Sequence, residues 1–167
     1  MTKPGVSRET LLAEVTEDVI PGWAIAVVQL NSLVAERLGV TETDVQCLHA
    51  LGRHGRATPG ALAKYVNLTT GSASRMIDRL VAAGCVRRVA DPHDRRRVLI
   101  EPTQDGLDRV RAAYAGLVAR TRDDLADFDD AELDTVIRFM RTAERSTAAE
   151  IQRLQTAPGS SRVDARR

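Results

Sequence analysis

A chain of 167 residues is long enough for one domain with a sizeable core, or for a small domain with a dimerising extension. Its formal net charge of +1 gives no sign of a nucleic-acid partner, and no apolar stretch approaches the roughly 18 residues that span a bilayer. No glycine-rich phosphate loop, nucleophile elbow or metal-ligand spacing is present, so we expect neither an enzyme nor a metal or cofactor site.

The cysteine content and the start of the chain predict a cytoplasmic protein. Two cysteines, Cys47 and Cys85, are present without paired spacing. The chain does not open on an apolar run that leads to a small-residue cleavage site. We therefore expect a protein without membrane association whose thiols stay reduced and serve as small core residues.

The first forty residues predict two helices with a break between them. Residues 8–20 place their apolar side chains on one side of a helix. Pro21-Gly22 is expected to break or sharply kink this helix, because proline lacks the backbone donor and clashes with the preceding turn. Residues 23–38 are apolar on most sides, which predicts broad burial, and Gly39 suits a left-handed stop.

Residues 41–69 predict two further helices with well-marked starts. Thr41-Glu42-Thr43-Asp44 has the pattern of a capping box before a helix with apolar residues at spacing three. Thr58-Pro59 supplies an N-cap and a proline at the first helical position, where a missing donor costs nothing. Residues 60–65 are therefore predicted as a short helix, and Thr69 is expected to cap the helix that follows.

The helix expected over residues 70–83 has one apolar and one polar face. Its apolar side chains cluster at about 100° per residue, and they are Ala73, Met76, Ile77, Leu80 and Val81. The polar face begins with short hydroxyl side chains and continues to Arg75. Small residues allow a close approach to DNA, hydroxyls can donate to bases or phosphates, and arginine can bind guanine through two hydrogen bonds. The alternative is an ordinary amphipathic helix with a polar solvent face.

A basic hairpin is predicted after this helix. Residues 85–89 alternate as a strand, residues 98–100 are β-branched and apolar, and residues 90–97 form the loop between them. The consecutive cations Arg95-Arg96-Arg97 would repel one another without an anionic partner. A tip arginine suits the negative potential of a narrow minor groove, with Asp94 holding the Arg96 side chain extended. The alternative is a loop tip that is merely soluble.

The charge of the chain is unevenly distributed. Residues 53–100 hold ten Lys or Arg against three acidic residues, a net charge of +7, and the remainder carries −6. A basic centre between acidic flanks is typical of a phosphate-binding surface. On charge alone, a solvated charged face is an equal alternative.

The C-terminal third predicts two long helices with apolar stripes, over residues 103–126 and from residue 129 to residue 154. Long helices depend on packing for stability, and this acidic helical mass exceeds what one small winged helix needs for a core. We therefore favour packing across a twofold axis over completion of a monomer's core. Residues 156–167 are predicted to be a disordered tail.

Together these segments resemble the MarR family of winged helix-turn-helix transcription regulators. Thr58-Pro59-Gly60-Ala61-Leu62-Ala63 is similar to the family's third helix and residues 68–80 to its recognition helix. Asp91-Pro92-His93-Asp94-Arg95-Arg96 with Val98 is similar to its wing, and Thr103-Gln104-Asp105-Gly106 to the segment after it. The resemblance covers residues 23–154. Pro21-Gly22 departs from it, since many members have a continuous first helix there.

The resemblance implies a mostly α-helical fold with a small β-hairpin wing. A winged helix-turn-helix domain over residues 41–102 would lie between dimerisation helices over residues 1–40 and 103–155. The homodimer would bind a pseudo-palindromic operator in double-stranded DNA, with residues 70–83 in the major groove and residues 90–97 in the minor groove. Arg96 would enter that groove, supported by Asp94. The DNA-binding residues that this implies are Thr58, Thr69, Thr70, Gly71, Ser72, Ser74, Arg75, Arg79, Asp94, Arg95, Arg96 and Arg97.

The resemblance also implies repression that is relieved by a small effector, often aromatic or phenolic. Trp23 is expected in the core, and the alternative is that it lines an effector pocket, with Val27 as the second candidate contact. Two other functions stay open. One is a winged-helix module for protein interaction, which would tolerate loss of the outward arginines, and the other is a constitutive DNA-binding protein without a small-molecule ligand.

Overall fold

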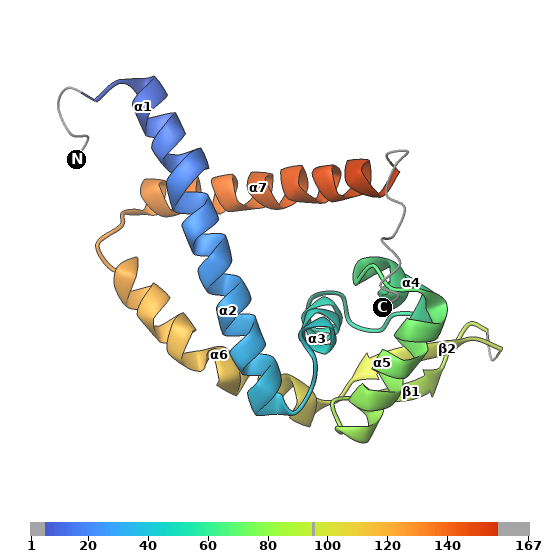
Figure 1. The fold of residues 1–167 in the computed structure, drawn as a ribbon. Coiled ribbons are helices and arrows are strands. Elements are labelled where there is room, and N and C mark those ends of the chain that lie inside the picture. Colours follow the sequence, from blue (N-terminus) through green and yellow to red (C-terminus); the bar gives the residue numbers. More distant parts are fainter. Residues whose placement is uncertain (1–5, 95, 157–167) are drawn as a thin grey trace, which may run out of the picture. The chain divides into compact units, whose positions relative to one another are not determined.

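The structure is a computed structural model that describes residues 6–94 and 96–156. Ten elements follow one another along the described chain (Figure 1): α1 (Arg8–Ala13), η1 (Glu14–Val19), α2 (Ile20–Leu38), α3 (Glu42–His54), α4 (Pro59–Tyr65), α5 (Thr70–Ala82), β1 (Val86–Ala90), β2 (Val98–Pro102), α6 (Gln104–Asp124) and α7 (Asp130–Thr156). The fold is mostly helical with one antiparallel hairpin, as predicted. The chain divides within α6 into two compact units, residues 1–117 and 118–167.

The N-terminal helix runs through Pro21-Gly22, so the predicted break is wrong. The π-helical segment η1 immediately precedes the proline, and at its end the Ile20 N–H bonds to the carbonyl oxygen of Val15, five residues back. In an ordinary α-helix the proline ring would clash with the carbonyl four residues earlier. The wider π turn leaves room for the proline ring and tolerates the backbone hydrogen bond that proline cannot donate. The helix therefore continues into α2.

The prediction that α2 is broadly buried is also wrong. Among its described side chains only Val34 and Ala35 are buried, both near the C-terminal end that packs on α3. Trp23, expected in the core, is 56% exposed. The apolar sequence of α2 correctly predicted a helix with a large apolar surface. Within residues 6–117, however, other elements cover only the C-terminal part of that surface. The predicted stop is confirmed, since Gly39 has a φ of 67°.

The winged-helix core forms where α3, α4, α5 and the hairpin meet. Apolar side chains from each element are almost inaccessible there, and they include Leu48, Leu51, Leu62, Met76, Ile77, Leu80 and Ile100. The predicted helix starts are confirmed: Thr41 and Asp44 form a reciprocal capping box, and Thr58 and Thr69 cap α4 and α5. An isolated antiparallel bridge between Ala57 and Ile100 joins the segment before α4 to strand β2.

The hairpin begins one residue later than predicted because Cys85 belongs to the capping turn that follows α5. Its N–H donates to the carbonyl of Leu80, and Gly84 takes a φ of 70° to make that turn. Strands β1 and β2 then pair antiparallel, from Val86 opposite Pro102 to Ala90 opposite Val98. This stop directs the chain from α5 straight into β1.

The second unit contains α7, which is expected from its apolar stripe. Asp129 and Glu132 cap each other's backbone N–H groups at its start, with nitrogen–oxygen distances of 2.8 and 3.0 Å. Within the described chain α7 buries none of its side chains. Large apolar residues on it are about half exposed: Ile137, Phe139, Met140, Ile151 and Leu154. No helix of the described residues is long and apolar enough to cross a membrane.

Candidate nucleic-acid interface

The first two turns of α5 present small polar groups to solvent. The Thr69 hydroxyl accepts the Ser72 N–H at 3.3 Å, and the Arg75 guanidinium donates to the Ser72 hydroxyl at 3.2 Å. The Ser74 hydroxyl donates to the carbonyl of Thr70 at 3.1 Å, which leaves its lone pairs available. These four side chains therefore make only local, exposed hydrogen bonds that a DNA phosphate or base edge can replace.

Gly71 stands in the same turn and has open space around it. A Cβ atom built there would meet no atom within 4 Å. The glycine therefore serves no packing purpose within the chain, whereas a flat helix surface lets a duplex approach the backbone closely. The opposite face of α5 is buried through Ala73, Met76, Ile77 and Leu80, as predicted, so the polar turns are held outward. Val81, the fifth residue of the predicted apolar face, is 36% exposed.

The wing is shaped by two aspartates that bond to its own backbone. Asp91 is largely buried, and its carboxylate accepts the His93 N–H at 2.9 Å. The Asp94 carboxylate accepts the Arg96 N–H at 3.0 Å, while its carbonyl accepts the Arg97 N–H at 2.9 Å. Asp94 thus supports Arg96 through the backbone, whereas the sequence had suggested a contact with the side chain.

These bonds engage the acids of the loop and leave its cations outward. Arg96 and Arg97 are exposed, and within the described residues neither forms an ion pair with an acid. Arg95 lies outside the described residues. Other cations of the hairpin are paired: Arg88 lies 2.7 Å from Asp78 of α5, which fastens β1 to that helix. The loop therefore presents exposed arginines at the tip of a hairpin whose strand β1 is attached to α5 by an ion pair.

A second carboxylate gathers arginines at the base of the hairpin. Glu101 of β2 lies 2.7 Å from Arg87 of β1 and 2.6 Å from Arg56, which precedes α4. The hydrogen bonds from Arg87 and Arg56 hold the pKa of Glu101 below its ordinary value. Neither arginine was among the predicted DNA contacts, and both are engaged within the subunit.

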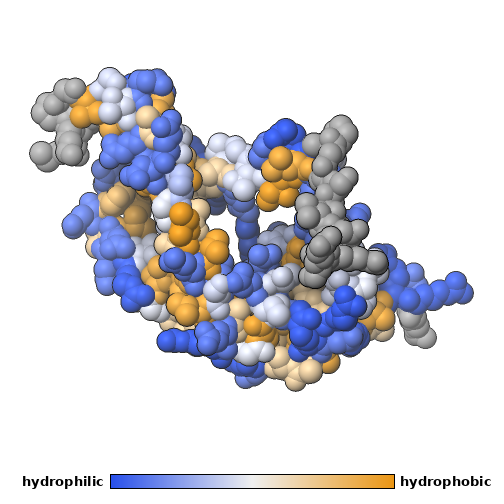
Figure 2. All heavy atoms as spheres, in the orientation of Figure 1, coloured by the Kyte–Doolittle hydropathy of each residue, from blue (hydrophilic) through white to orange (hydrophobic). Residues whose placement is uncertain are grey.

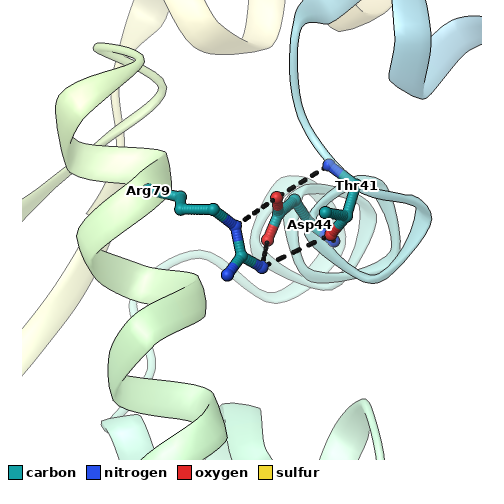
Figure 3. Close-up of polar contacts among 3 residues, drawn as sticks. All are labelled: Thr41, Asp44 and Arg79. Carbon is teal, nitrogen blue, oxygen red and sulfur yellow. Dashed lines mark hydrogen bonds and ion pairs between the residues drawn. The ribbon is translucent and has the colours of Figure 1, made fainter.

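Arg79 lies apart from the other predicted DNA residues. It reaches from α5 to the start of α3 (Figure 3), where its Nη2 lies 2.8 Å from Asp44 Oδ1 and its Nε 3.1 Å from Asp44 Oδ2. The same Nη2 lies 3.4 Å from the hydroxyl of Thr41. The Asp44 side chain is 0% exposed. The sequence placed Arg79 at the edge of the DNA-facing side, and the structure gives its guanidinium a partner within the subunit.

Comparisons with known proteins agree with this geometry. A family model described as MarR family matches residues 38–97. The uncharacterized HTH-type transcriptional regulator YcgE of Bacillus subtilis is 33% identical over 128 residues, which cover 77% of this chain and 83% of that protein. The chain belongs to the MarR family. It is therefore a transcriptional regulator with a DNA-binding winged-helix fold, and its family is not a class of enzymes.

Other MarR-family members match over shorter stretches or by fold alone. The multiple antibiotic resistance protein MarR of Salmonella typhimurium is 36% identical over 69 residues, 41% of this chain and 48% of that protein. A MarR family protein from Bacillus stearothermophilus has a TM-score of 0.66 at 22% identity, covering 86% and 99% of the two chains. A mutant of S. aureus MepR bound to an oligodeoxyribonucleotide has a TM-score of 0.55 at 19% identity, covering 77% and 95%.

Sequence reasoning missed a second arginine tie in this MarR-family chain. Arg109 of α6 donates to the carbonyl of Ala83 at 2.9 Å and to the carbonyl of Leu38 at 3.2 Å. It therefore caps the C-terminal ends of α5 and α2 together, where the helix dipoles favour a cation. Its place on a polar stretch of α6 gave no sign of these partners, which lie 26 and 71 residues away.

The predicted effector contacts lie on the exposed part of α2. Trp23 is exposed and Val27, one turn later, is half-buried. One further turn along α2, Asn31 accepts a hydrogen bond from the Tyr114 hydroxyl at 2.6 Å, and His49 packs edge-on against the Tyr114 ring. Within the described residues, no group of three or more His, Cys, Asp or Glu could hold a metal ion.

Proposed function

We propose that this MarR-family chain acts in the cytoplasm as a homodimeric repressor whose hold on a pseudo-palindromic operator is loosened by a small effector. One observation carries the DNA-reading part of the proposal. The exposed start of α5 and the exposed arginines of the wing belong to one packed unit, and within the described residues Arg96 and Arg97 form no ion pair with its acids. Such a surface has its cations ready for a polyanionic partner.

The division of labour on DNA follows from side-chain chemistry. Residues 70–83 enter the major groove, where Arg75 binds a guanine edge and the hydroxyls of Thr70, Ser72 and Ser74 contact bases or phosphates. The wing over residues 90–97 lies along the minor groove, whose negative potential attracts Arg96. Thr58 and Thr69, at the starts of α4 and α5, approach the sugar–phosphate backbone of the DNA. MepR, a fold neighbour, is bound to an oligodeoxyribonucleotide in its structure.

The homodimer explains the uncovered apolar surface. The segment from α1 to α2 exposes many large apolar side chains (Figure 2), and they are Leu11, Leu12, Val15, Val19, Trp23, Ile25, Val28 and Leu33. Helix α7 exposes a similar set and buries none of its side chains within the described chain. Helices of this kind are stable when a partner covers them. A second copy of the same chain supplies matching apolar faces from the same segments.

The effector is expected to be a small aromatic or phenolic molecule that contacts Trp23 and Val27. These two side chains lie on one side of α2, one turn apart, within the surface assigned to the dimer. A ligand bound there weakens the protein–operator complex only if it binds one arrangement of the helices more tightly than the other. Whether such a molecule acts is measured by adding it to the protein–operator complex.

The test is a titration of the purified protein with DNA from immediately upstream of its own gene, at several salt concentrations. Arg75→Ala is expected to lose about 1–3 kcal/mol of binding free energy, if Arg75 binds guanine through two hydrogen bonds. Arg96→Ala is expected to weaken binding and to make its salt dependence shallower. Arg111→Ala, which removes an exposed arginine of α6, is the control. Unchanged affinity in both wing and helix variants would contradict the proposed readout.

A further inference from the structure

We propose that Asp44 and Arg79 are positioning residues for DNA reading: their two-pronged ion pair sets the orientation of α5, and Arg79 does not contact DNA. This inference rests on the proposed function, since it concerns how the recognition helix is aimed. From its place on α5 alone, Arg79 would be expected to contact the duplex.

Both oxygens of the Asp44 carboxylate accept hydrogen bonds (Figure 3), while the Arg79 side chain stays 46% exposed. Asp44 Oδ2 accepts both the Arg79 Nε and the backbone N–H of Thr41, at 3.1 and 2.8 Å, and Oδ1 accepts the Arg79 Nη2 at 2.8 Å. The Thr41 hydroxyl in turn accepts the Asp44 N–H. A planar guanidinium that bonds to both carboxylate oxygens fixes an angle as well as a distance. The pair therefore constrains rotation of α5 about its own axis.

The rest of the packing around α5 is less directional. Its buried face consists of Ala73, Met76, Ile77 and Leu80, and apolar burial is roughly proportional to area rather than to direction. On the other flank, Asp78 pairs with Arg88 at 2.7 Å, but these side chains are 64% and 45% exposed, so solvent screens the pair. Arg79 is also 46% exposed, but its partner Asp44 is fully buried, so solvent screens this pair from one side only and it is the stiffer of the two restraints.

The burial of Asp44 also opposes a contact between Arg79 and DNA. If the guanidinium moved to a phosphate, Asp44 would remain as a buried carboxylate without its counter-charge, which is strongly unfavourable. Its attachment point is also significant. Asp44 lies in the first turn of α3, immediately after the end of α2, so the pair links the recognition helix to the junction of α2 and α3.

The experiment compares the wild-type protein with Asp44→Asn, Arg79→Lys, Arg79→Met and the double variant Asp44→Asn/Arg79→Met. Asparagine keeps the size of Asp44 and can still accept the Thr41 N–H, and lysine keeps the charge of Arg79 without its fork. Asp108→Asn, in an exposed pair on α6, is the matched control. The probes are the duplex that the wild-type protein enriches from a random-sequence library, and a scrambled duplex of equal length and composition. Thermal unfolding establishes that each variant is folded.

We expect Asp44→Asn, Arg79→Lys and Arg79→Met each to weaken binding to the enriched duplex by about tenfold, the value of one lost base contact. Binding to the scrambled duplex should change by less than about threefold, with the same salt slope. The double variant should bind no more weakly than Arg79→Met. In the free protein, amide hydrogen exchange over residues 70–82 should be faster in Asp44→Asn and Arg79→Lys.

A direct phosphate contact predicts a different pattern. Arg79→Met would then weaken both duplexes alike and flatten the salt slope by about one charge, while Arg79→Lys and Asp44→Asn would bind as the wild type does. That pattern overturns the inference. If the wild-type protein enriches no sequence at all, the proposed function fails first and the inference falls with it, so the two failures are distinguishable.

Discussion

The two cysteines show how burial decides the chemistry of a single residue. Cys47 on α3 and Cys85 before β1 are almost inaccessible, as expected for small core residues. Burial, with the nearby Asp44 charge, raises the pKa of the Cys47 thiol to about 12. Burial also raises the pKa of Cys85, although the neighbouring Arg109 opposes that change. Because the thiolate is the reactive form, both side chains are chemically quiet in the native protein.

The folded protein should therefore resist thiol reagents at pH 8. We expect slow labelling by a disulfide reagent such as 5,5′-dithiobis(2-nitrobenzoic acid), and rapid modification of both cysteines once urea unfolds the chain. Cys47 should react last in the native state, because its pKa is far above the pH of the experiment. Mass spectrometry of peptides after timed labelling measures both sites. Fast native labelling of Cys47 would contradict the burial.

At the scale of elements, helix ends are held by side chains from other helices. Arg109 of α6 bonds to the last carbonyls of α5 and α2 at once, through Ala83 and Leu38. Gly106, one turn earlier on α6, packs so closely on Cys85 that a Cβ atom there would collide with its backbone. The start of α6 is thus fastened to the turn between α5 and β1. The wing and α5 are in turn positioned by α6 as well as by the core.

Removing the Arg109 guanidinium should loosen this junction. Arg109→Met keeps much of the side-chain volume but leaves two carbonyl groups without their charged donor, which we expect to lower the free energy of unfolding by roughly 2 kcal/mol. Arg111→Met, in an exposed pair with Asp108 on the same helix, should cost far less. Urea unfolding at one fixed protein concentration compares the two variants. Equal losses would show that Arg109 has no special role.

At the scale of the whole molecule, apolar surface decides the expected assembly. The chain has a well-buried winged-helix core, yet its longest helix, α7, buries no side chain within the described residues. The segment from α1 to α2 has the same property over most of its length. Exposed apolar area of this extent is expected to be covered by a second copy.

We therefore predict a dimer in solution that single charges can break. Met140→Asp, on the apolar side of α7, is expected to give a monomer or a sharply weakened dimer, because a carboxylate would be buried without a partner. Ala149→Asp introduces the same group on the opposite side of α7 and should leave the dimer intact. Light scattering coupled to size-exclusion chromatography gives the mass of each variant. A monomeric wild-type protein at micromolar concentration would refute the assembly.

The sequence by itself determined whatever depends on neighbours along the chain. The caps at Thr41, Thr58 and Thr69, the apolar face of α5 and the turn-rich basic loop are all local patterns, and each was predicted. These patterns were sufficient to indicate the fold class and the candidate DNA-reading surface. They succeed because hydrogen bonds at helix starts and the periodicity of apolar residues act over a few positions.

Only the tertiary structure decided which cations are already engaged. Asp44 and Arg79 are 35 residues apart, and nothing in either local pattern indicates that they meet. The continuation of the helix through Pro21 and the exposure of Trp23 were missed for related reasons. A π turn adjusts to its proline only in the folded backbone, and an apolar pattern marks a face without naming what covers it. Long-range pairing depends on how elements pack, which periodicity alone does not encode.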